Sequence, residues 1–304
     1  MRNSFIDTIT QITSIDKRLM VITADMGFSV FESYREKFPE NILNVGISEA
    51  NMIGLSAGLA MNGKIPIAYS IIPFLTMRCF EQIRVDLCYQ NLNVKLVGSG
   101  GGLSYGLLGP THHSTEDISI MRSIPNMCVI CPADSYEAHC AVKAAYERPG
   151  PVYIRLGKNE PKYHSNSPDF KIGKGIVAIE GEDLTIITTG AMFKTGLDVV
   201  DQLSKAGINA RLVSMHTIKP LDTELIIECA NTTKAIVTIE EHSLIGGLGS
   251  AVAETLVDNQ IATKLKRFAL PDEFSKTVGG QSYLLSLNRL TPKDISNEIL
   301  RLLR

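Results

Sequence analysis

The sequence predicts an α/β protein of two doubly wound domains, the first with a mainly parallel sheet and the second smaller. Three observations support this fold. Short apolar segments alternate with helical patterns up to residue 160, which is typical of a parallel sheet covered on both faces. Residues 159–174 are polar and rich in turn formers, and a second alternation follows them. We therefore expect a first domain over 1–160, a linker over 161–175 and a second domain over 176–304.

The first domain opens with an amphipathic helix, and six apolar segments then predict its strands. These segments are RLMVITAD, NILNVGI, IPIAYSI, NVKLVGSG, NMCVICPA and GPVYIRLG, with helices predicted at 48–61, 76–90, 115–123 and 134–147. In the second domain the predicted strands are LTIITTG, NARLVSM, AIVTIEE and LKRFALP, with helices at 192–206, 222–230, 249–259 and 291–303.

Composition excludes several classes of function. A length of 304 residues is sufficient for two domains with cores of their own. The net charge is −2 and no basic stripe is present, which argues against a nucleic-acid partner. No apolar stretch reaches the roughly 18 residues that span a bilayer. The N-terminus does not read as a signal peptide, so we expect a cytoplasmic protein without a membrane partner.

Cys128 and Cys131 form a C-x-x-C motif, which in other contexts indicates zinc or redox chemistry. Here the motif lies in a predicted strand, so alternation places the two side chains on opposite faces of the sheet. No second pair and no nearby histidine completes a site. We interpret both as buried structural cysteines and expect no metal site in this chain.

Glu49 is the one acidic side chain in the apolar and small-residue stretch NVGISEANMIGLSAGLA. Ser48 is well placed as the N-cap of the helix, so Glu49 lies in its first turn. One interpretation is a carboxylate satisfied by free amides and the helix dipole, worth roughly 0.3–1 kcal/mol. The other is functional, because a strand-to-helix turn lies on the ligand-binding edge of an open α/β sheet.

Several motifs, in order, resemble the transketolase superfamily. GISEANMIGLSAGLA is similar to the strand–helix segment of its pyrimidine-binding domain, and ADMGFS, YSIIPFLTMRCFEQIR, GPTHH and GPVYIRLGK agree with it. TIKPLD and IVTIEEHSLIGGLGSAVAE resemble the C-terminal domain shared with deoxyxylulose-phosphate synthases and the β subunits of 2-oxo-acid dehydrogenases. The resemblance spans nearly all of the chain. It implies two-carbon ketol transfer from a ketose, or ketose phosphate, to an aldehyde or ketone sugar, with thiamine diphosphate as the cofactor.

The resemblance also implies roles for single residues at the cofactor. In this superfamily a glutamate hydrogen-bonds a ring nitrogen of the aminopyrimidine and so promotes removal of the thiazolium C2 proton. That residue here is Glu49, and Phe74 matches the aromatic contact of the aminopyrimidine, although by itself Phe74 reads as core. The same segments place Ile47 and Arg78 at the cofactor.

Substrate residues are implied in the same way. His112 in GPTHH matches the histidine at the substrate C1 and C2 oxygens, and imidazole suits proton transfer near neutral pH. His113 is a second candidate, at a position where relatives often have glutamine. Arg2, Ser29 and Arg155 match positions that hold a sugar phosphate, although an arginine that ends a strand is otherwise a common surface residue.

Two departures from the superfamily pattern concern the substrate. Leu108 stands where transketolases usually have an aspartate that contacts a hydroxyl, and Gly100 stands where many have a phosphate-binding histidine. The glycine-rich GSGGGLSYG also suggests more room than usual. We therefore expect a sugar other than the pentose-phosphate set, such as one with a bulky or non-phosphate end.

The GDG motif that holds the diphosphate and Mg²⁺ in these enzymes does not occur in the sequence. The chain therefore resembles the C-terminal half of a split transketolase. The resemblance implies a partner subunit that binds the diphosphate and Mg²⁺, and an assembly of two copies of each half.

Other functions stay open at this point. On the same scaffold the chain fits a deoxyxylulose-phosphate-synthase-like or 2-oxo-acid-decarboxylating enzyme, or a non-catalytic regulatory subunit. GLSYG fits the hydrolase pattern G-x-S-x-G, but LLGP after it opposes the helix that a nucleophile elbow needs. Asp222 and His242 would have to complete that triad. His242 with glycines 246, 247 and 249 reads more simply as a tight turn before a helix. No G-x-G-x-x-G opens a helix, which argues against dinucleotide binding.

Overall fold

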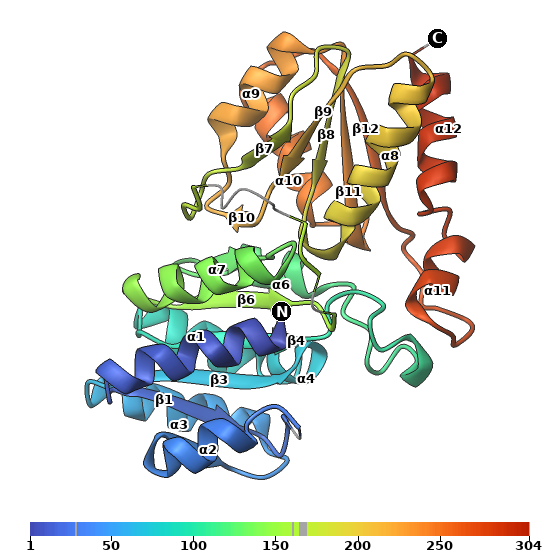
Figure 1. The fold of residues 1–304 in the computed structure, drawn as a ribbon. Helices are drawn as coiled ribbons and strands as arrows, with labels where there is room; N and C mark the ends of the chain where they lie inside the picture. The colour runs from blue at the N-terminus through green and yellow to red at the C-terminus, as the bar shows by residue number, and fades with distance from the viewer. Residues whose placement is uncertain (28, 160, 164–168, 304) are drawn as a thin grey trace.

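Two α/β domains lie one above the other in the computed structural model, which describes residues 1–27, 29–159, 161–163 and 169–303 (Figure 1). In the described residues the first domain has a seven-stranded sheet in the order β10-β5-β6-β4-β3-β1-β2. The second has a five-stranded sheet in the order β12-β11-β8-β9-β7. The strands are β1 (Leu19–Thr23), β2 (Ile42–Asn44), β3 (Ile65–Ile71), β4 (Lys95–Ser99), β5 (Cys128–Ile130), β6 (Val152–Leu156), β7 (Ile176–Ile179), β8 (Leu184–Thr188), β9 (Ala210–Ser214), β10 (Thr217–Lys219), β11 (Ala235–Ser243) and β12 (Lys264–Leu270).

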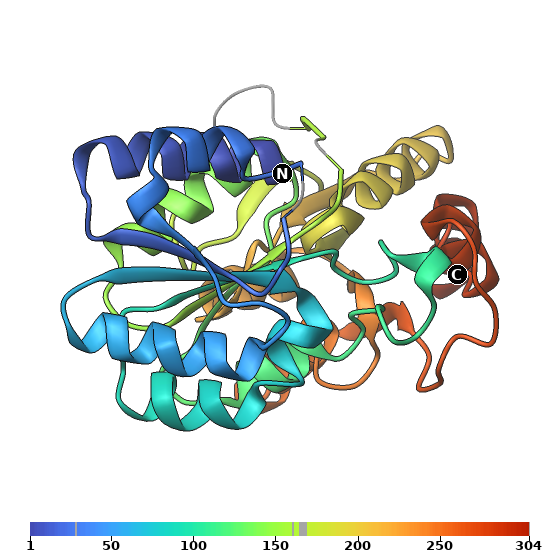
Figure 2. The same cartoon turned by 90° about the horizontal axis from the view of Figure 1, so that it is seen from below.

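Helices cover both faces of the first sheet (Figure 2). They are α1 (Arg2–Ile15), α2 (Glu32–Lys37), η1 (Pro39–Asn41), α3 (Glu49–Met61), α4 (Ile72–Thr76), α5 (Phe80–Gln82), η2 (Ile83–Tyr89), η3 (Gly106–Leu108), α6 (Asp117–Ser123) and α7 (Ser135–Glu147). The second domain has η4 (Gly190–Met192), α8 (Phe193–Lys205), α9 (Thr223–Thr232), α10 (Leu248–Asp258), α11 (Gln281–Leu287) and α12 (Pro292–Leu302). The predicted α/β class is confirmed, and the strand pairs other than β10–β5 and β7–β9 are parallel.

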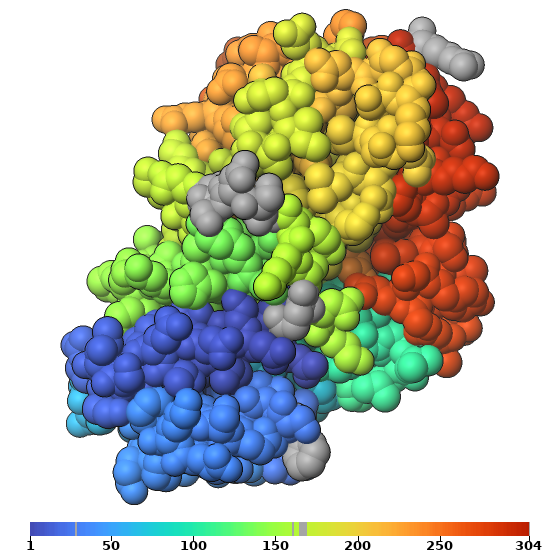
Figure 3. All heavy atoms as spheres, in the orientation of Figure 1, coloured from blue at the N-terminus to red at the C-terminus, as the bar shows by residue number. Residues whose placement is uncertain are grey.

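The apolar core continues from one domain into the other. One cluster lies between the first sheet and α3, α4, η2 and α6, and it includes Val213, Ile226 and Val252 of the second domain. In the space-filling view the second domain rests directly on the green part of the first (Figure 3). Cys131 belongs to this cluster, whereas Cys128 packs on the opposite face with α1 and α7. The predicted burial of the two cysteines on opposite faces of the sheet is therefore confirmed.

Two elements differ from the sequence-based expectation. The single helix expected over 76–90 is wrong, because α4 ends at Thr76 and is followed by the short α5 and the π-helix η2. The amides of Met77 and Arg78 both donate to the carbonyl of Pro73, so the chain turns before α5 begins. The second difference is β10, which belongs to the second half of the sequence but pairs antiparallel with β5 of the first sheet. The expected bounds 1–160, 161–175 and 176–304 otherwise stay predictions.

Candidate active site

Glu49 begins α3, at the carboxyl-terminal edge of the first sheet. Its side chain is 2% exposed, and Oε2 accepts a hydrogen bond from Nη1 of Arg78 at 2.6 Å. The hydroxyl of Ser70 lies 3.5 Å from Oε1. A buried carboxylate needs a partner of this kind. The Arg78 side chain is 48% exposed, so the partner of this buried carboxylate reaches the surface.

Ser48 occupies the N-cap position of α3 as predicted, but its side chain does not cap the helix. The hydroxyl donates to the carbonyl of Val45 at 2.9 Å instead. Glu49 is therefore the residue that brings negative charge to the helix N-terminus, where the dipole favours it.

Aromatic and cationic side chains extend the site outward from Glu49. The guanidinium carbon of Arg78 lies 4.4 Å from the centre of the Phe74 ring. The Phe74 ring in turn meets the imidazole of His112 edge-on, with centroids 5.1 Å apart. Glu49, Arg78, Phe74 and His112 come from three separate segments, and the fold brings these four together. We name them the Glu49 cluster.

His112 is carried by a loop that closes on itself. Gly102 and Ser114 form a backbone bridge at its neck, with N–O distances of 3.1 and 2.9 Å. We name this segment the 102–114 loop. Inside it, Oγ1 of Thr111 lies 2.9 Å from Nδ1 of His112 and holds the imidazole from one side. The histidine is therefore presented on a short, tied loop.

Tyr105 and Lys158 join the site although sequence reasoning did not select them. The Tyr105 ring lies 6.5 Å from the His112 ring, centre to centre. Nζ of Lys158 lies 5.5 Å from the centre of the Tyr105 ring. Lys158 is exposed and lies two residues after the end of β6. This position just beyond a strand is the sequence feature that could have identified Lys158 as a site residue. The mouth of the site therefore carries an exposed cation.

Gly100 does not enlarge the site, which corrects the expectation of extra room. A Cβ at this position would overlap the ring of Tyr105, and the backbone has φ +89°. A side chain at Gly101 would lie 2.7 Å from Nη1 of Arg155. The glycines are present because neighbouring side chains approach the backbone closely.

Arg155 is a second correction, because it lies in the interior and not at a phosphate site. Nε pairs with Oδ2 of Asp117 at 2.8 Å, and both side chains are at most 5% exposed. Nη2 donates to the carbonyls of Ser114 at 2.8 Å and Glu241 at 3.0 Å. The guanidinium therefore ties the first domain to the second.

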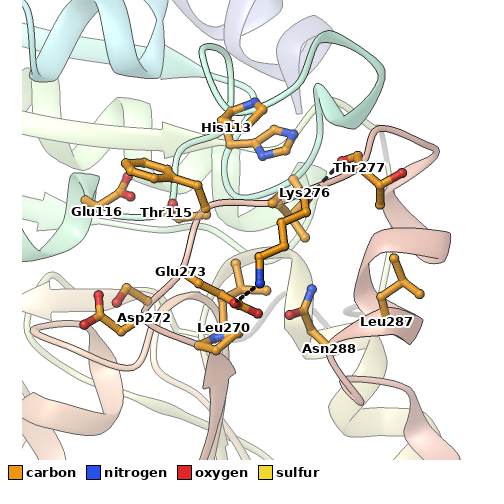
Figure 4. Close-up of a pocket in the computed structure, with 16 residues that line it drawn as sticks. His113, Thr115, Glu116, Leu270, Asp272, Glu273, Lys276, Thr277, Leu287 and Asn288 are labelled. Carbon is orange, nitrogen blue, oxygen red and sulfur yellow. Dashed lines mark hydrogen bonds and ion pairs between the residues drawn. The ribbon is translucent and has the colours of Figure 1, made fainter.

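His113 lines a different cavity from the Glu49 cluster, and its role at the substrate stays a prediction. It is buried and lines a cavity of about 320 Å³ between the domains, opposite Asp272, Glu273 and Lys276 (Figure 4). Burial lowers the pKa of its imidazole, against a hydrogen bond to the backbone of Gly106 that raises it. His113 is consequently neutral at physiological pH and belongs to the domain interface.

The remaining predicted residues are exposed or only partly buried. Ile47 is 78% exposed just before α3, and Leu108 is 54% exposed at the end of η3. Ser29 is exposed at φ +58°, and its amide donates to Glu32. Arg2 is partly buried in the first turn of α1. Their roles stay predictions.

The alternative sites resolve into structural features. His242 lies near the end of β11, where its ring accepts the amide of Ser119 and contacts the carbonyl of Ser243. The tight turn interpreted from the sequence follows it over 244–247 and leads into α10. Asp222 caps α9, and Ser104 donates to the carbonyl of Gly101. Within the described residues no contact assembles Ser104, His242 and Asp222 into a triad.

Two further kinds of feature are absent from the parts of the chain that the structure describes. Three or more His, Cys, Asp or Glu side chains do not gather anywhere there as a metal site would require. Nor is any described helix long and apolar enough to cross a membrane.

Comparisons with known proteins decide the family. The model of the transketolase pyrimidine-binding domain matches residues 1–162, more than half of the chain, and that of the transketolase C-terminal domain matches 173–295. The chain belongs to the transketolase family. It carries the pyrimidine-binding domain first and the C-terminal domain after it.

Two similar proteins are named as transketolase subunits, and a similar solved structure is described as a split gene transketolase. A 6-deoxy-6-sulfo-D-fructose transketolase subunit of Clostridium sp. (strain MSTE9) is 39% identical over 97% of this transketolase chain and 92% of its own. A subunit of the apulose-4-phosphate transketolase from Phocaeicola vulgatus is 37% identical over 93% and 90%. A solved structure described as a split gene transketolase, inactive beta4 tetramer, superposes with a TM-score of 0.92 at 38% identity and covers 99% of this chain and 97% of the other.

Proposed function

We propose that this chain is the half of a two-subunit, cytoplasmic transketolase that holds the aminopyrimidine of thiamine diphosphate and the reacting end of a sugar. The Glu49 cluster is the observation that carries the proposal. A buried carboxylate beside an aromatic ring fits a flat heterocycle that donates a hydrogen bond from a ring nitrogen and takes the place of the Arg78 guanidinium over both groups. The bound cofactor supplies the carbanion chemistry.

This chain's own residues bind, orient and move protons. Glu49 accepts the hydrogen bond of the heterocycle once Arg78 has moved aside, and Phe74 packs against its face. His112 donates to the oxygens at C1 and C2 of the sugar and passes protons as they change. In the reaction the C2–C3 bond of a ketose breaks, and its two-carbon ketol unit joins the carbonyl carbon of an aldehyde or ketone. The proton lost from the C3 hydroxyl of the donor is balanced by the proton gained at the new hydroxyl.

A partner subunit is proposed for the diphosphate and Mg²⁺, because the sequence contains no GDG motif and the described residues offer no metal cluster. Two copies of each half are proposed in the assembly. Support comes from α3, where no atom lies within 4 Å of the Cβ positions at Gly54 and Gly58. Both glycines are exposed, so this face of the helix has room for close approach of another backbone.

We propose a substrate that carries an anionic group at the end opposite the ketol. Lys158 at the mouth of the site supplies the positive charge, and Leu108 replaces a polar contact with an apolar one. The two relatives are named for a sulfonated and a phosphorylated sugar, both anionic. We therefore rank sugars with a sulfonate or phosphate outside the pentose-phosphate set first among donors.

The test is native mass spectrometry of the tagged chain purified from its own host, with thiamine diphosphate and Mg²⁺ in the buffer. We expect a second chain of similar size and the cofactor in one assembly. A ketol-transfer assay of that assembly with 6-deoxy-6-sulfo-D-fructose, apulose 4-phosphate and xylulose 5-phosphate then identifies the donor. A homo-oligomer that binds no cofactor under these conditions would contradict the proposal.

A further inference from the structure

Two adjacent buried glutamates of β11 bind different parts of the molecule. Glu240 accepts the amides of Leu248 and Gly249 at the start of α10, each at 2.7 Å. Glu241 points the other way, as alternation along a strand requires, and its Oε1 accepts the amide of Leu103 at 2.7 Å. Leu103 lies in the 102–114 loop. A carboxylate of the second domain is therefore bonded to the loop that carries His112.

Gln281, the first residue of α11, completes the contact. Its Nε2 donates to both carboxylate oxygens of Glu241, at 3.0 and 2.8 Å, and lies 3.5 Å from Oγ of Ser104. Glu241 is 3% exposed, and burial raises its pKa, while the bonds from Gln281 and Leu103 lower it. A buried carboxylate held by these hydrogen bonds is firmly placed, because losing any one leaves an unsatisfied charge.

The loop is shaped to receive Glu241. A Cβ at Gly102 would overlap the carboxylate, and the backbone there has φ +63°, so glycine is required at this position. Nη2 of Arg155 bridges the carbonyls of Glu241 and Ser114 at the loop neck. Further along, the amide of Gly279 donates to the carbonyl of Gly106 at 3.3 Å. Contacts with the second domain thus run from the neck of the loop to η3.

We propose that Glu241 and Gln281 are positioning residues that fasten the 102–114 loop to the second domain and thereby hold Tyr105 and His112 at Phe74. The inference rests on the proposed function for the purpose of the loop, and on the structure alone for its attachment. By this inference the second domain contributes to the reaction at the first domain, because it holds His112 in place without contacting the substrate.

The first test is hydrogen–deuterium exchange with mass spectrometry on the full chain. Glu241→Gln turns an N–H toward the amide of Gln281, so we expect exchange in peptides of 101–114 to accelerate by about tenfold. Glu240→Gln is the matched control, since it is equally buried on the same strand. It should accelerate exchange near 246–252 and leave 101–114 unchanged. Equal effects of both variants on 101–114 would overturn the inference.

A rescue distinguishes positioning from general damage. Gln281→Glu alone puts two carboxylates together and should loosen the loop. The double variant Glu241→Gln with Gln281→Glu restores one amide facing one carboxylate, with the Gln oxygen still able to accept from Leu103. Exchange in 101–114 should return to within about threefold of wild type. A double variant as loose as the worse single variant would contradict the pairing.

The effect on His112 is read with histidine labelled by ¹³C at Cε1, assigned through a His112→Asn variant. The His112 resonance should shift in Glu241→Gln and stay in place in Glu240→Gln, and an unmoved resonance would contradict the inference. These readouts need neither partner nor substrate. If the variants change exchange and the His112 resonance as expected but the assembly shows no ketol transfer, the proposed function fails and the attachment of the loop stands. If the assembly transfers ketol units but the variants cause neither change, the attachment fails and the proposed function stands.

Discussion

The guanidinium of Arg78 covers the two groups to which the cofactor's heterocycle would bind. Nη1 lies 2.6 Å from Oε2 of Glu49, and the guanidinium carbon lies 4.4 Å from the centre of the Phe74 ring. The same side chain is half exposed. Arg78 therefore pairs with the buried charge of Glu49 in the lone chain, and the proposed function requires another donor to displace it.

A double-mutant cycle measures this pairing. Arg78→Ala should lower the free energy of unfolding by about 1–2 kcal/mol, because it leaves the buried carboxylate of Glu49 without its charged donor. In a Glu49→Gln background the same change should cost much less. Urea denaturation followed by circular dichroism of the lone chain gives all four values. Equal costs in both backgrounds would show that the two side chains do not interact.

Glu49→Gln tests whether this half takes part in catalysis. In the assembly with the partner subunit we expect ketol transfer to fall by about 10² or more, because an amide does not replace an ionised carboxylate toward the cofactor's ring nitrogen. Glu298→Gln on α12 is the matched control, since Glu298 is at the surface and pairs only with Arg301 among the described residues. If Glu49→Gln were as active as wild type, the chain would be a regulatory subunit.

Gly100→Ala should destabilise the chain by about 1–3 kcal/mol, since the new methyl group overlaps Tyr105 and φ is +89°. The same substitution at Gly58 in the interior of α3 meets no atom within 4 Å and should stabilise the lone chain by up to about 1 kcal/mol. Thermal unfolding of the two variants decides the matter. If the Gly100→Ala variant were as stable as wild type, the interpretation that this glycine leaves extra room in the site would be restored.

Gly54→Leu tests the exposed face of α3 as a contact between subunits. The side chain enters open space in the lone chain, so we expect no loss of thermal stability there. In the assembly the same bulk should prevent close helix approach and lower the mass measured by light scattering. Ser204→Leu, at an exposed position of α8, should change neither quantity. An intact assembly with Gly54→Leu would move the interface elsewhere.

Lys95 makes the stability of the first domain depend on pH. Its ammonium is buried and donates to the carbonyls of Arg148 and Gly150, each at 2.7 Å, and burial lowers its pKa to about 7. Above that value the unfolded chain still holds the proton that the folded chain has lost, so stability rises with pH. Between about pH 7.5 and 9 the wild type should gain about 1.4 kcal/mol per pH unit relative to Lys95→Met. The free energy of unfolding of both proteins is measured by urea denaturation at each pH. If it changed equally with pH in the two proteins, the pKa of Lys95 would lie above this range.

Features fixed by local chemistry were predictable from the sequence. The start of α3 at Glu49 follows from a strand, a small residue at the N-cap position and a run of small residues. Alternation from β5 into the residue after it separates Cys128 from Cys131. Contacts between distant segments were not predictable. Arg155 ends a strand as many surface arginines do, and nothing local reveals Asp117, 38 residues away, as its partner.

Gly100 was misread for a related reason. A glycine-rich segment looks the same in sequence whether the missing side chains leave space or make way for others. The Tyr105 ring that decides between these cases is only five residues along the chain, but the turn that brings it back over Gly100 has no signature in the residue pattern. Lys158 escaped notice because its neighbour Tyr105 lies on a different segment.

β10 changes where this chain can be cut. If residues 1–160 were expressed without the rest, β5 would lose its antiparallel neighbour and present the free backbone groups of Cys128–Ile130 to other molecules. Such a fragment would invite edge-to-edge association and precipitate, whatever the quality of its core. A dissection of the molecule, or a fusion of either half to another protein, must therefore carry residues 217–219 with the first sheet.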